Sequence, residues 1–285
     1  MDHIPIADLF SDREFNWSEE AQGFASGDGF WFVTQKAGLR RIANTQPLAS
    51  DFGELHAIPQ FLRNEGYNHF GDPDCFNSSI FVPLEGKIVW PQGSFTIRPR
   101  LCAFDTRTMI FQGWASFPDQ PTNAAWVAAY PGTGLVYSSN EHPDVIFGYQ
   151  VVIDIYGLTM KTVVRTPLLD ENGKQFVPGQ VQGGAFTPDG KLLVLSIKAE
   201  NDEIQCFDIP SGKRVKRKYM APAGLNSENE GLMIVNHGVT PLHPHLIVYA
   251  LILNNDVLES DNVSVKRYEI RTGSVPPVVT RGGTP

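Results

Sequence analysis

Five short segments of this 285-residue chain open in nearly the same way and recur at the spacing of propeller blades. Their middle residues are at positions 23, 71, 125, 183 and 231, so the intervals are 48, 54, 58 and 48 residues. Each opening is followed by a short apolar run rich in β-branched and aromatic residues, and then by a turn. The openings are Gln22-Gly23-Phe24, Phe70-Gly71-Asp72, Ala124-Ala125-Trp126, Gln182-Gly183-Gly184 and Glu230-Gly231-Leu232.

This repeat predicts an all-β fold, a five-bladed β-propeller with four antiparallel strands per blade, formed by residues 1–285 as a single domain. The composition agrees, because 26 glycines, 21 prolines and only 19% charged residues suit many short strands joined by tight turns. We expect Met1–Trp17 to add a strand to the last blade, since closing the ring removes free sheet edges.

Charge and hydropathy patterns exclude several classes of partner. The net charge of −8 disfavours nucleic acid, and we interpret the basic run Lys213–Lys218 as a solvated edge strand. No apolar run reaches the roughly 18 residues that span a bilayer, so no membrane partner is expected. Met1–Phe10 lacks the pattern of a signal peptide, which favours a cytoplasmic protein, although a secreted mature form stays open. Nothing in the sequence indicates the oligomeric state.

The repeat also predicts where a site would lie. The first strand of each blade lines the central channel, so polar residues at the five openings should converge from distant parts of the sequence. Histidine moves protons near neutral pH, and a nearby carboxylate fixes its tautomer. We therefore predict the catalytic residues His69, His142, Asp72, Glu141 and Glu230, and the substrate-binding residues Gln22, Asn123, Trp126, Asn140 and Gln182.

Two alternatives concern this channel. One is a hard cation such as Ca²⁺, structural or catalytic, for which Asp72 and Glu230 would be candidate ligands. The other is a hydrogen-bonded lining that holds only water and no cofactor. The sequence has no zinc motif and no EF-hand loop. The five tryptophans do not recur at one blade position, which favours a single site for one small molecule over repeated sugar sites.

Three long connections are predicted to be walls or lids of this site, because long loops in compact domains tend to be functional. They are Leu48–Tyr67, Pro83–Arg100 and Pro167–Gln180. A short helix on the rim is expected between Glu54 and Glu65.

Several longer phrases carry a resemblance to known proteins: His69-Phe70-Gly71-Asp72 followed by Val82-Pro83-Leu84-Glu85, Tyr137-Ser138-Ser139-Asn140, Gln182–Gly190 and Glu230-Gly231-Leu232. Together they resemble five-bladed β-propeller proteins of bacteria and fungi. The chain is also loosely similar to calcium-dependent lactonase propellers and to fungal propeller-like cyclases, including hetero-Diels–Alder enzymes.

With the convergent polar set, these resemblances imply a biosynthetic enzyme with one site at the channel mouth. It would act on a fairly apolar small molecule by acid/base-assisted elimination, cyclisation or cycloaddition, in a pocket shaped by Trp or Phe side chains. A metal-dependent hydrolase such as a lactonase, and a non-catalytic propeller that binds a ligand or sugar, remain alternatives.

Overall fold

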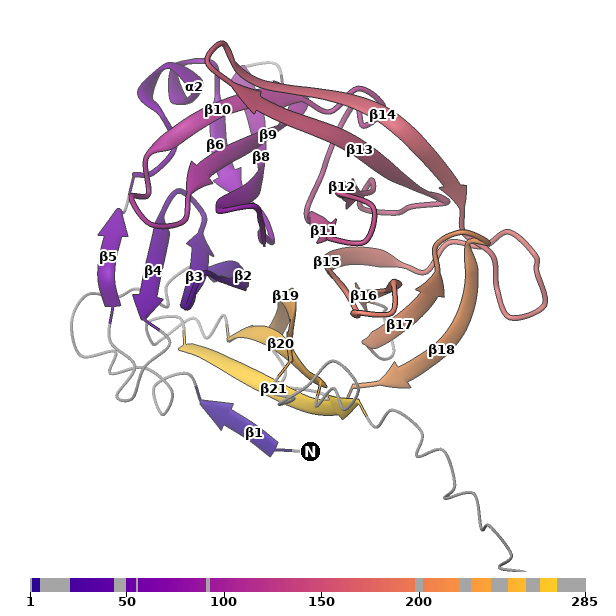
Figure 1. Ribbon diagram of the computed structural model, residues 1–285. Coiled ribbons are helices and arrows are strands. Elements are labelled where there is room, and N and C mark those ends of the chain that lie inside the picture. The colour runs from indigo at the N-terminus through magenta and orange to yellow at the C-terminus, as the bar shows by residue number, and fades with distance from the viewer. Residues whose placement is uncertain are drawn as a thin grey trace, which may run out of the picture.

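Five antiparallel sheets are arranged in a ring around a central axis, which confirms the predicted five-bladed propeller (Figure 1). The computed structural model describes residues 2–5, 21–43, 50–54, 56–90, 93–197, 202–220, 227–236, 246–254 and 262–270. Each blade runs from an innermost strand outward, in chain order, so that neighbouring strands pair as hairpins.

The first two blades hold β2 to β10. Blade 1 consists of β2 (Ala21–Gly27), β3 (Phe30–Gln35), β4 (Leu39–Ala43) and β5 (Ser50–Glu54). Blade 2 consists of β6 (Tyr67–Phe70), β7 (Asp74–Phe76), β8 (Ser79–Trp90), β9 (Gly93–Asp105) and β10 (Phe111–Ser116). The innermost position of blade 2 is shared by β6 and β7, which both pair with β8 on either side of Asp72.

Blades 3 to 5 follow the same plan. Blade 3 consists of β11 (Ala128–Tyr130), β12 (Leu135–Ser138), β13 (Val145–Asp154) and β14 (Gly157–Pro167). Blade 4 consists of β15 (Gln180–Phe186), β16 (Lys191–Ile197), β17 (Glu203–Asp208) and β18 (Lys213–Tyr219). Blade 5 consists of β19 (Ser227–Asn236), β20 (Leu246–Asn254) and β21 (Asn262–Ile270).

The fifth sheet takes its outermost strand from the other end of the chain. β1 (Asp2–Pro5) pairs antiparallel with β21, with Asp2 opposite Arg267 and Pro5 opposite Ser264. Figure 1 shows this strand lying outside β21, next to the N-terminus. The first and last described strands therefore complete one sheet.

Two local predictions can be compared with these elements. The rim helix is α2 (Gln60–Asn64), within the expected range. The expected loop Pro83–Arg100 was wrong, because β8 extends to Trp90 and β9 begins at Gly93 as one long hairpin. The segment was expected to be a long connection, but only residues 91–92 separate the two strands.

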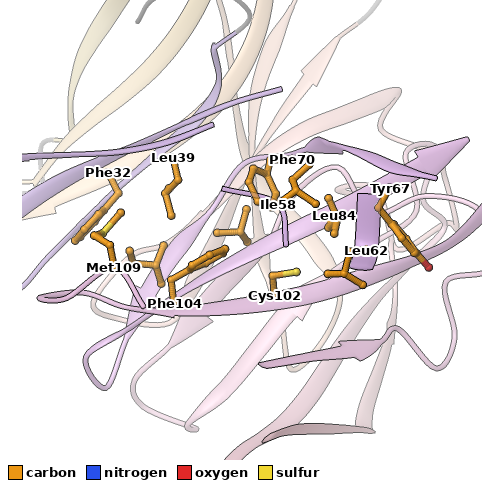
Figure 2. Close-up of a cluster of buried hydrophobic side chains, with 12 residues drawn as sticks. Phe32, Leu39, Ile58, Leu62, Tyr67, Phe70, Leu84, Cys102, Phe104 and Met109 are labelled. Atoms are coloured by element: carbon orange, nitrogen blue, oxygen red, sulfur yellow. The ribbon is translucent and has the colours of Figure 1, made fainter. Parts of the chain in front are cut away.

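Aromatic and aliphatic side chains fill the space between successive blades. Between blades 1 and 2, Phe32 and Leu39 from blade 1 face Phe70 and Phe104 from blade 2, and Cys102 is fully buried there (Figure 2). Phe70 and Phe104 meet edge to face, with ring centroids 6.1 Å apart. Because the aromatic residues are used in this packing, the channel is left to polar side chains.

The basic run forms β18, the outer strand of blade 4, as the sequence predicted. Lys213, Lys216 and Lys218 are exposed on it, whereas Arg214 turns inward and donates to Gln205 Oε1 at 2.9 Å. In the described part of the chain, no helix has the length and apolarity needed to cross a membrane.

Candidate functional site

The innermost strands of three blades each carry a β-bulge at the same place. The pairing with the second strand shifts register between Ala21 and Gly23 in β2, between Val181 and Gly183 in β15, and between Asn229 and Gly231 in β19. One residue is left over at each shift, namely Gln22, Gln182 and Glu230. A bulge re-aims the side chain that it carries, and all three side chains line the same cavity.

Directly after these residues, the three strands close around Asp72, which is fully buried. Its carboxylate accepts hydrogen bonds from the backbone N–H groups of Phe24 (3.1 Å), Gly184 (3.2 Å) and Leu232 (3.1 Å). These donors belong to blades 1, 4 and 5, whereas Asp72 belongs to blade 2. One side chain therefore connects four blades at the axis.

The backbone of Asp72 reaches the remaining blade. Its N–H donates to Ala125 O at 2.8 Å, and the N–H of Val127 donates to Asp72 O at 3.0 Å. These two bonds form a parallel bridge between Asp72 and Trp126. All five blades are thus hydrogen-bonded to one aspartate.

The glycines of the repeat are explained by their closeness to this aspartate. A Cβ atom on Gly23 would lie 2.4 Å from Asp72 Cα, and one on Gly231 would lie 2.6 Å from Asp72 Oδ1. On Gly183 it would lie 3.0 Å from Asp72 Oδ2. A side chain at Gly23 or Gly231 would displace the strand from the axis. The repeat is therefore mainly a packing signal.

A cavity of about 210 Å³ lies at the end of the channel where the innermost strands begin. Its residues come from all five blades, and two of them, Gly71 and Ala125, adjoin the Asp72 bridge. The others are polar: Gln22, His69, Glu85, Glu141, Gln182, Glu228 and Glu230. The lining contains no Trp or Phe among the described residues, which differs from the aromatic pocket expected from the sequence.

Glu230 and Glu228 form a carboxyl pair on the blade 5 side. Glu230 is only 5% exposed, whereas Glu228 is exposed. Burial raises the pKa of Glu230 well above its ordinary value, and the hydrogen bond and charge of Glu228 raise it further. Glu230 therefore binds a proton more strongly than a solvated carboxyl group does.

Glu85 and His69 face each other across the β6–β8 pairing on the blade 2 side. Glu85 Oε1 accepts the backbone N–H of Ala124 at 2.6 Å. Burial raises the pKa of Glu85, the Ala124 N–H lowers it, and the charge of Glu141 raises it. Blade 2 therefore offers an imidazole and a carboxyl group to the cavity.

Glu141, on the blade 3 side, is held by Asn123 in two directions. Asn123 Nδ2 donates to Glu141 Oε2 at 2.9 Å, and the backbone N–H of Glu141 donates to Asn123 Oδ1 at 3.0 Å. Behind them, fully buried Gln120 donates to the carbonyl oxygens of Asn123 and Ser139 and accepts from the hydroxyl of Tyr149. This network fixes the position of Glu141 from the core of blade 3.

Two further carboxyl groups with raised pKa values, those of Asp72 and Asp74, lie outside the cavity lining. Burial raises the pKa of Asp72 well above its ordinary value, although the N–H groups of Leu232, Phe24 and Gly184 lower it. Burial also raises the pKa of Asp74 to about 7, against the lowering by the N–H groups of Ala129 and Cys75. Together with Glu85, blade 2 therefore holds three carboxyl groups whose pKa values are raised.

The structure brings half of the predicted site residues together in the cavity lining, namely Gln22, His69, Glu141, Gln182 and Glu230. Asn123 lies behind Glu141, and Asp72 lies at the axis. The other three residues do not line the cavity: His142 is exposed, Asn140 is partly buried, and Trp126 is fully buried and donates its indole N–H to Ser139 Oγ at 3.0 Å.

Three residues that matter to this geometry had no role assigned from the sequence. Glu228, at a repeat opening, and Glu85, in a connection, belong to the polar set expected to converge at the channel, and both line the cavity. Gln120, which supports Glu141, was not expected. Gln120 lies in a Pro-containing connection with no recurring pattern, so nothing marks it in the sequence.

The residues do not form a ready-made calcium site. Carboxylate and amide oxygens are donors that suit Ca²⁺, but no group of three or more His, Cys, Asp or Glu side chains in the described ranges is placed to hold a metal ion. Glu85 and Glu141 already accept protein N–H groups, and both oxygens of Asp72 do so as well.

Comparison with known proteins identifies the fold. No family model and no curated protein matches the chain. Among solved structures, it is similar to a GH43_1 enzyme from Xanthomonas citri complexed with xylose, with a TM-score of 0.53 and 11% identity over 87% of each chain.

A putative gluconolactonase has a TM-score of 0.52 and 12% identity, over 90% of this chain and 77% of the other. A luciferin-regenerating enzyme has a TM-score of 0.50 and 10% identity, over 87% and 76%. The likeness to a lactonase propeller is therefore confirmed at the level of fold, and at these identities the comparisons show that this chain is a β-propeller.

Proposed function

We propose that this protein is a hydrolase that cleaves a C–O bond in a small hydroxylated ring, a lactone or a glycoside, by acid–base catalysis between carboxyl groups of the cavity. The observation that carries the proposal is Glu230, a buried carboxyl group that lines a cavity with other carboxyl groups and whose pKa burial raises well above its ordinary value. Hydrolysis of this type needs an acid and a base on either side of the bond that breaks.

The ring of blades separates the two roles in space. Glu230 and Glu228 belong to blade 5, whereas Glu85 and His69 belong to blade 2 and Glu141 follows β12 of blade 3. Blades 2 and 3 stand across the axis from blade 5 (Figure 1). A ligand in the cavity would therefore lie between the two groups.

For a lactone, the reaction would proceed as follows. Glu85 or His69 removes a proton from water as its oxygen adds to the carbonyl carbon. Glu230 gives its proton to the ring oxygen as the C–O bond breaks, and the products are a carboxylic acid and an alcohol. The site is reset when Glu85 or His69 releases its proton to solvent and Glu230 takes one up from water, for which the exposed neighbour Glu228 offers a route.

The size and polarity of the cavity support a single polar ring. A cavity of about 150 Å³ holds benzene, so 210 Å³ has room for one substituted six-membered ring. Gln22 and Gln182 offer both donors and acceptors for hydroxyl groups. The putative gluconolactonase and the xylose-bound GH43_1 enzyme have the same kind of fold, which supports the proposal by analogy only.

Elimination uses the same acid and base, so it is the second reaction class to test. Cyclisation or cycloaddition of an apolar substrate is the weaker proposal, because the lining offers proton donors and acceptors but no aromatic wall among the described residues.

The test is a pH-controlled assay of aldonolactones and 4-nitrophenyl glycosides with the wild-type protein, Glu230→Gln and Glu54→Gln. Glu54 is an exposed carboxylate that accepts the N–H of His56, so it is a matched control outside the cavity. We expect kcat/KM to fall about 10²- to 10⁴-fold in Glu230→Gln and to stay unchanged in Glu54→Gln. Unchanged turnover in Glu230→Gln, or no turnover of either class by folded protein, would contradict the proposal.

A further inference from the structure

The charges around the cavity are unbalanced. Four carboxyl groups line it: Glu85 from blade 2, Glu141 after β12 of blade 3, and Glu228 and Glu230 from blade 5. None of the described lining residues is Lys or Arg, and His69 is the only lining residue that can carry a positive charge. The carboxyl groups come from three blades, so their meeting is a consequence of the whole fold and not of one acidic loop.

Glu230 shows the imbalance most clearly. Only 5% of this residue is exposed, and it lines the cavity. Within the described part of the chain, its partner is the carboxyl group of Glu228, and no donor from outside the acidic set bonds to it. When such a buried carboxyl group ionises, it is stabilised by a positive partner, and among the described lining residues only His69 could supply one.

We infer that the ligand of this cavity carries the missing charge as an ammonium group on a small hydroxylated ring. The inference rests on the proposed function, because the ring would be that of the substrate. It goes further by assigning the substrate a positive charge. An ammonium group has three donors that point in different directions. It can therefore bond to carboxyl groups on separate walls, while Gln22 and Gln182 bond to hydroxyl groups.

A bare metal ion fits this arrangement less well. A divalent cation needs its ligands gathered within about 2.0 to 2.6 Å, and the described residues contain no group of three or more such side chains placed in that way. A cavity of about 210 Å³ is also larger than one ion requires. Carboxyl groups spread over several walls suit a polyatomic cation.

Three hexose derivatives of nearly equal size separate charge from shape: glucosamine, glucose and glucuronate, which are positive, neutral and negative at pH 7. Their dissociation constants would be measured by isothermal titration calorimetry, with thermal melting as a second readout. We expect glucosamine to bind at least about tenfold more tightly than glucose and to raise the melting temperature, and glucuronate to bind more weakly than glucose.

Glu228→Gln tests the source of the preference, because Glu228 is exposed and its replacement keeps the shape of the side chain. We expect this variant to lose most of the difference between glucosamine and glucose, while Glu54→Gln keeps it. The inference would be overturned if glucosamine does not bind, if it binds no more tightly than glucose, or if Glu228→Gln leaves the preference for glucosamine unchanged. It would also be overturned if calcium chloride alone stabilises the protein. Turnover of a neutral lactone or glycoside without glucosamine binding would remove the charge assignment and leave the proposed function intact.

Discussion

Asp72 shows how one residue can hold a ring of sheets together. Its carboxylate accepts three backbone N–H groups from three other blades, and its own backbone bonds to the fourth. Each of these groups is far from water, so an unmade bond would cost about 1–3 kcal/mol. A role in stability follows directly from these contacts, whereas the sequence suggested catalysis or metal binding.

We predict that Asp72→Asn lowers the free energy of unfolding by about 3 kcal/mol or more. The amide keeps only one acceptor oxygen and turns an NH₂ group toward N–H donors, so at least one buried donor is left unpaired. Urea denaturation at pH 7 would measure the change. Asp105→Asn is a matched control, since Asp105 accepts the backbone N–H groups of Arg107 and Thr108 in an exposed turn, and it should cost less. Wild-type stability with lost turnover would instead make Asp72 a catalytic residue.

At the scale of elements, the short strand β1 completes the sheet of blade 5. It consists of four residues and covers the outer edge of β21. An uncovered edge strand presents free N–H and C=O groups to other chains. The same short strand therefore completes blade 5 and protects it.

Removing residues 1–5 should lower the melting temperature and increase self-association. The physical reason is that β21 would lose its ladder partner and become a free edge. Thermal melting and light scattering after size-exclusion chromatography would measure the two effects. Replacing residues 2–5 with Gly-Ser-Gly-Ser keeps the chain length and should behave like the deletion. A truncated protein that melts and elutes like the wild type would show that β1 does not stabilise the ring.

At the scale of the whole molecule, the channel concentrates carboxyl groups whose pKa values are raised. Burial raises the pKa of Asp72, Asp74, Glu85 and Glu230, with that of Asp74 at about 7. Between about pH 4 and pH 7 the folded state therefore binds more protons than the unfolded state. Stability then falls as pH rises through this window.

We predict a higher melting temperature at pH 5.5 than at pH 8.5. Ionisation of Asp74 alone contributes at most about 4 kcal/mol, from roughly three pKa units at about 1.4 kcal/mol each. Asp105 and Asp208, which are partly exposed, have lowered pKa values, so their contribution is lost only on acidification below about pH 4. Melting curves across this range would test the sign, and Asp74→Asn should flatten the slope. A melting temperature that rises with pH would refute the prediction.

Much of this molecule could be predicted from its repeat. Gly23, Gly183 and Gly231 approach Asp72 so closely that little room is left for a side chain. Glycine therefore recurs at these openings, and this regular spacing can be recognised in the sequence. The residue before each glycine then points into the cavity, which is why Gln22, Gln182 and Glu230 were found.

Other features depend on geometry that a single sequence does not record. Asp72 and Glu230 are both acids at repeat openings, yet one lies on the axis among N–H donors and the other in a bulge facing the cavity. Trp126 resembled a binding residue, but the close approach of its ring to Gly184 places it in the core. His142 is exposed because it follows Glu141 in a connection, one position beyond the lining.

The aspartate at the axis also limits how this fold can change. Its two carboxylate oxygens and its backbone N–H and C=O reach all the other blades at hydrogen-bond distance, which sets the circumference of the ring. An inserted or deleted repeat would alter the circumference and move strands away from that single side chain. In this chain the number of blades is therefore tied to one carboxylate.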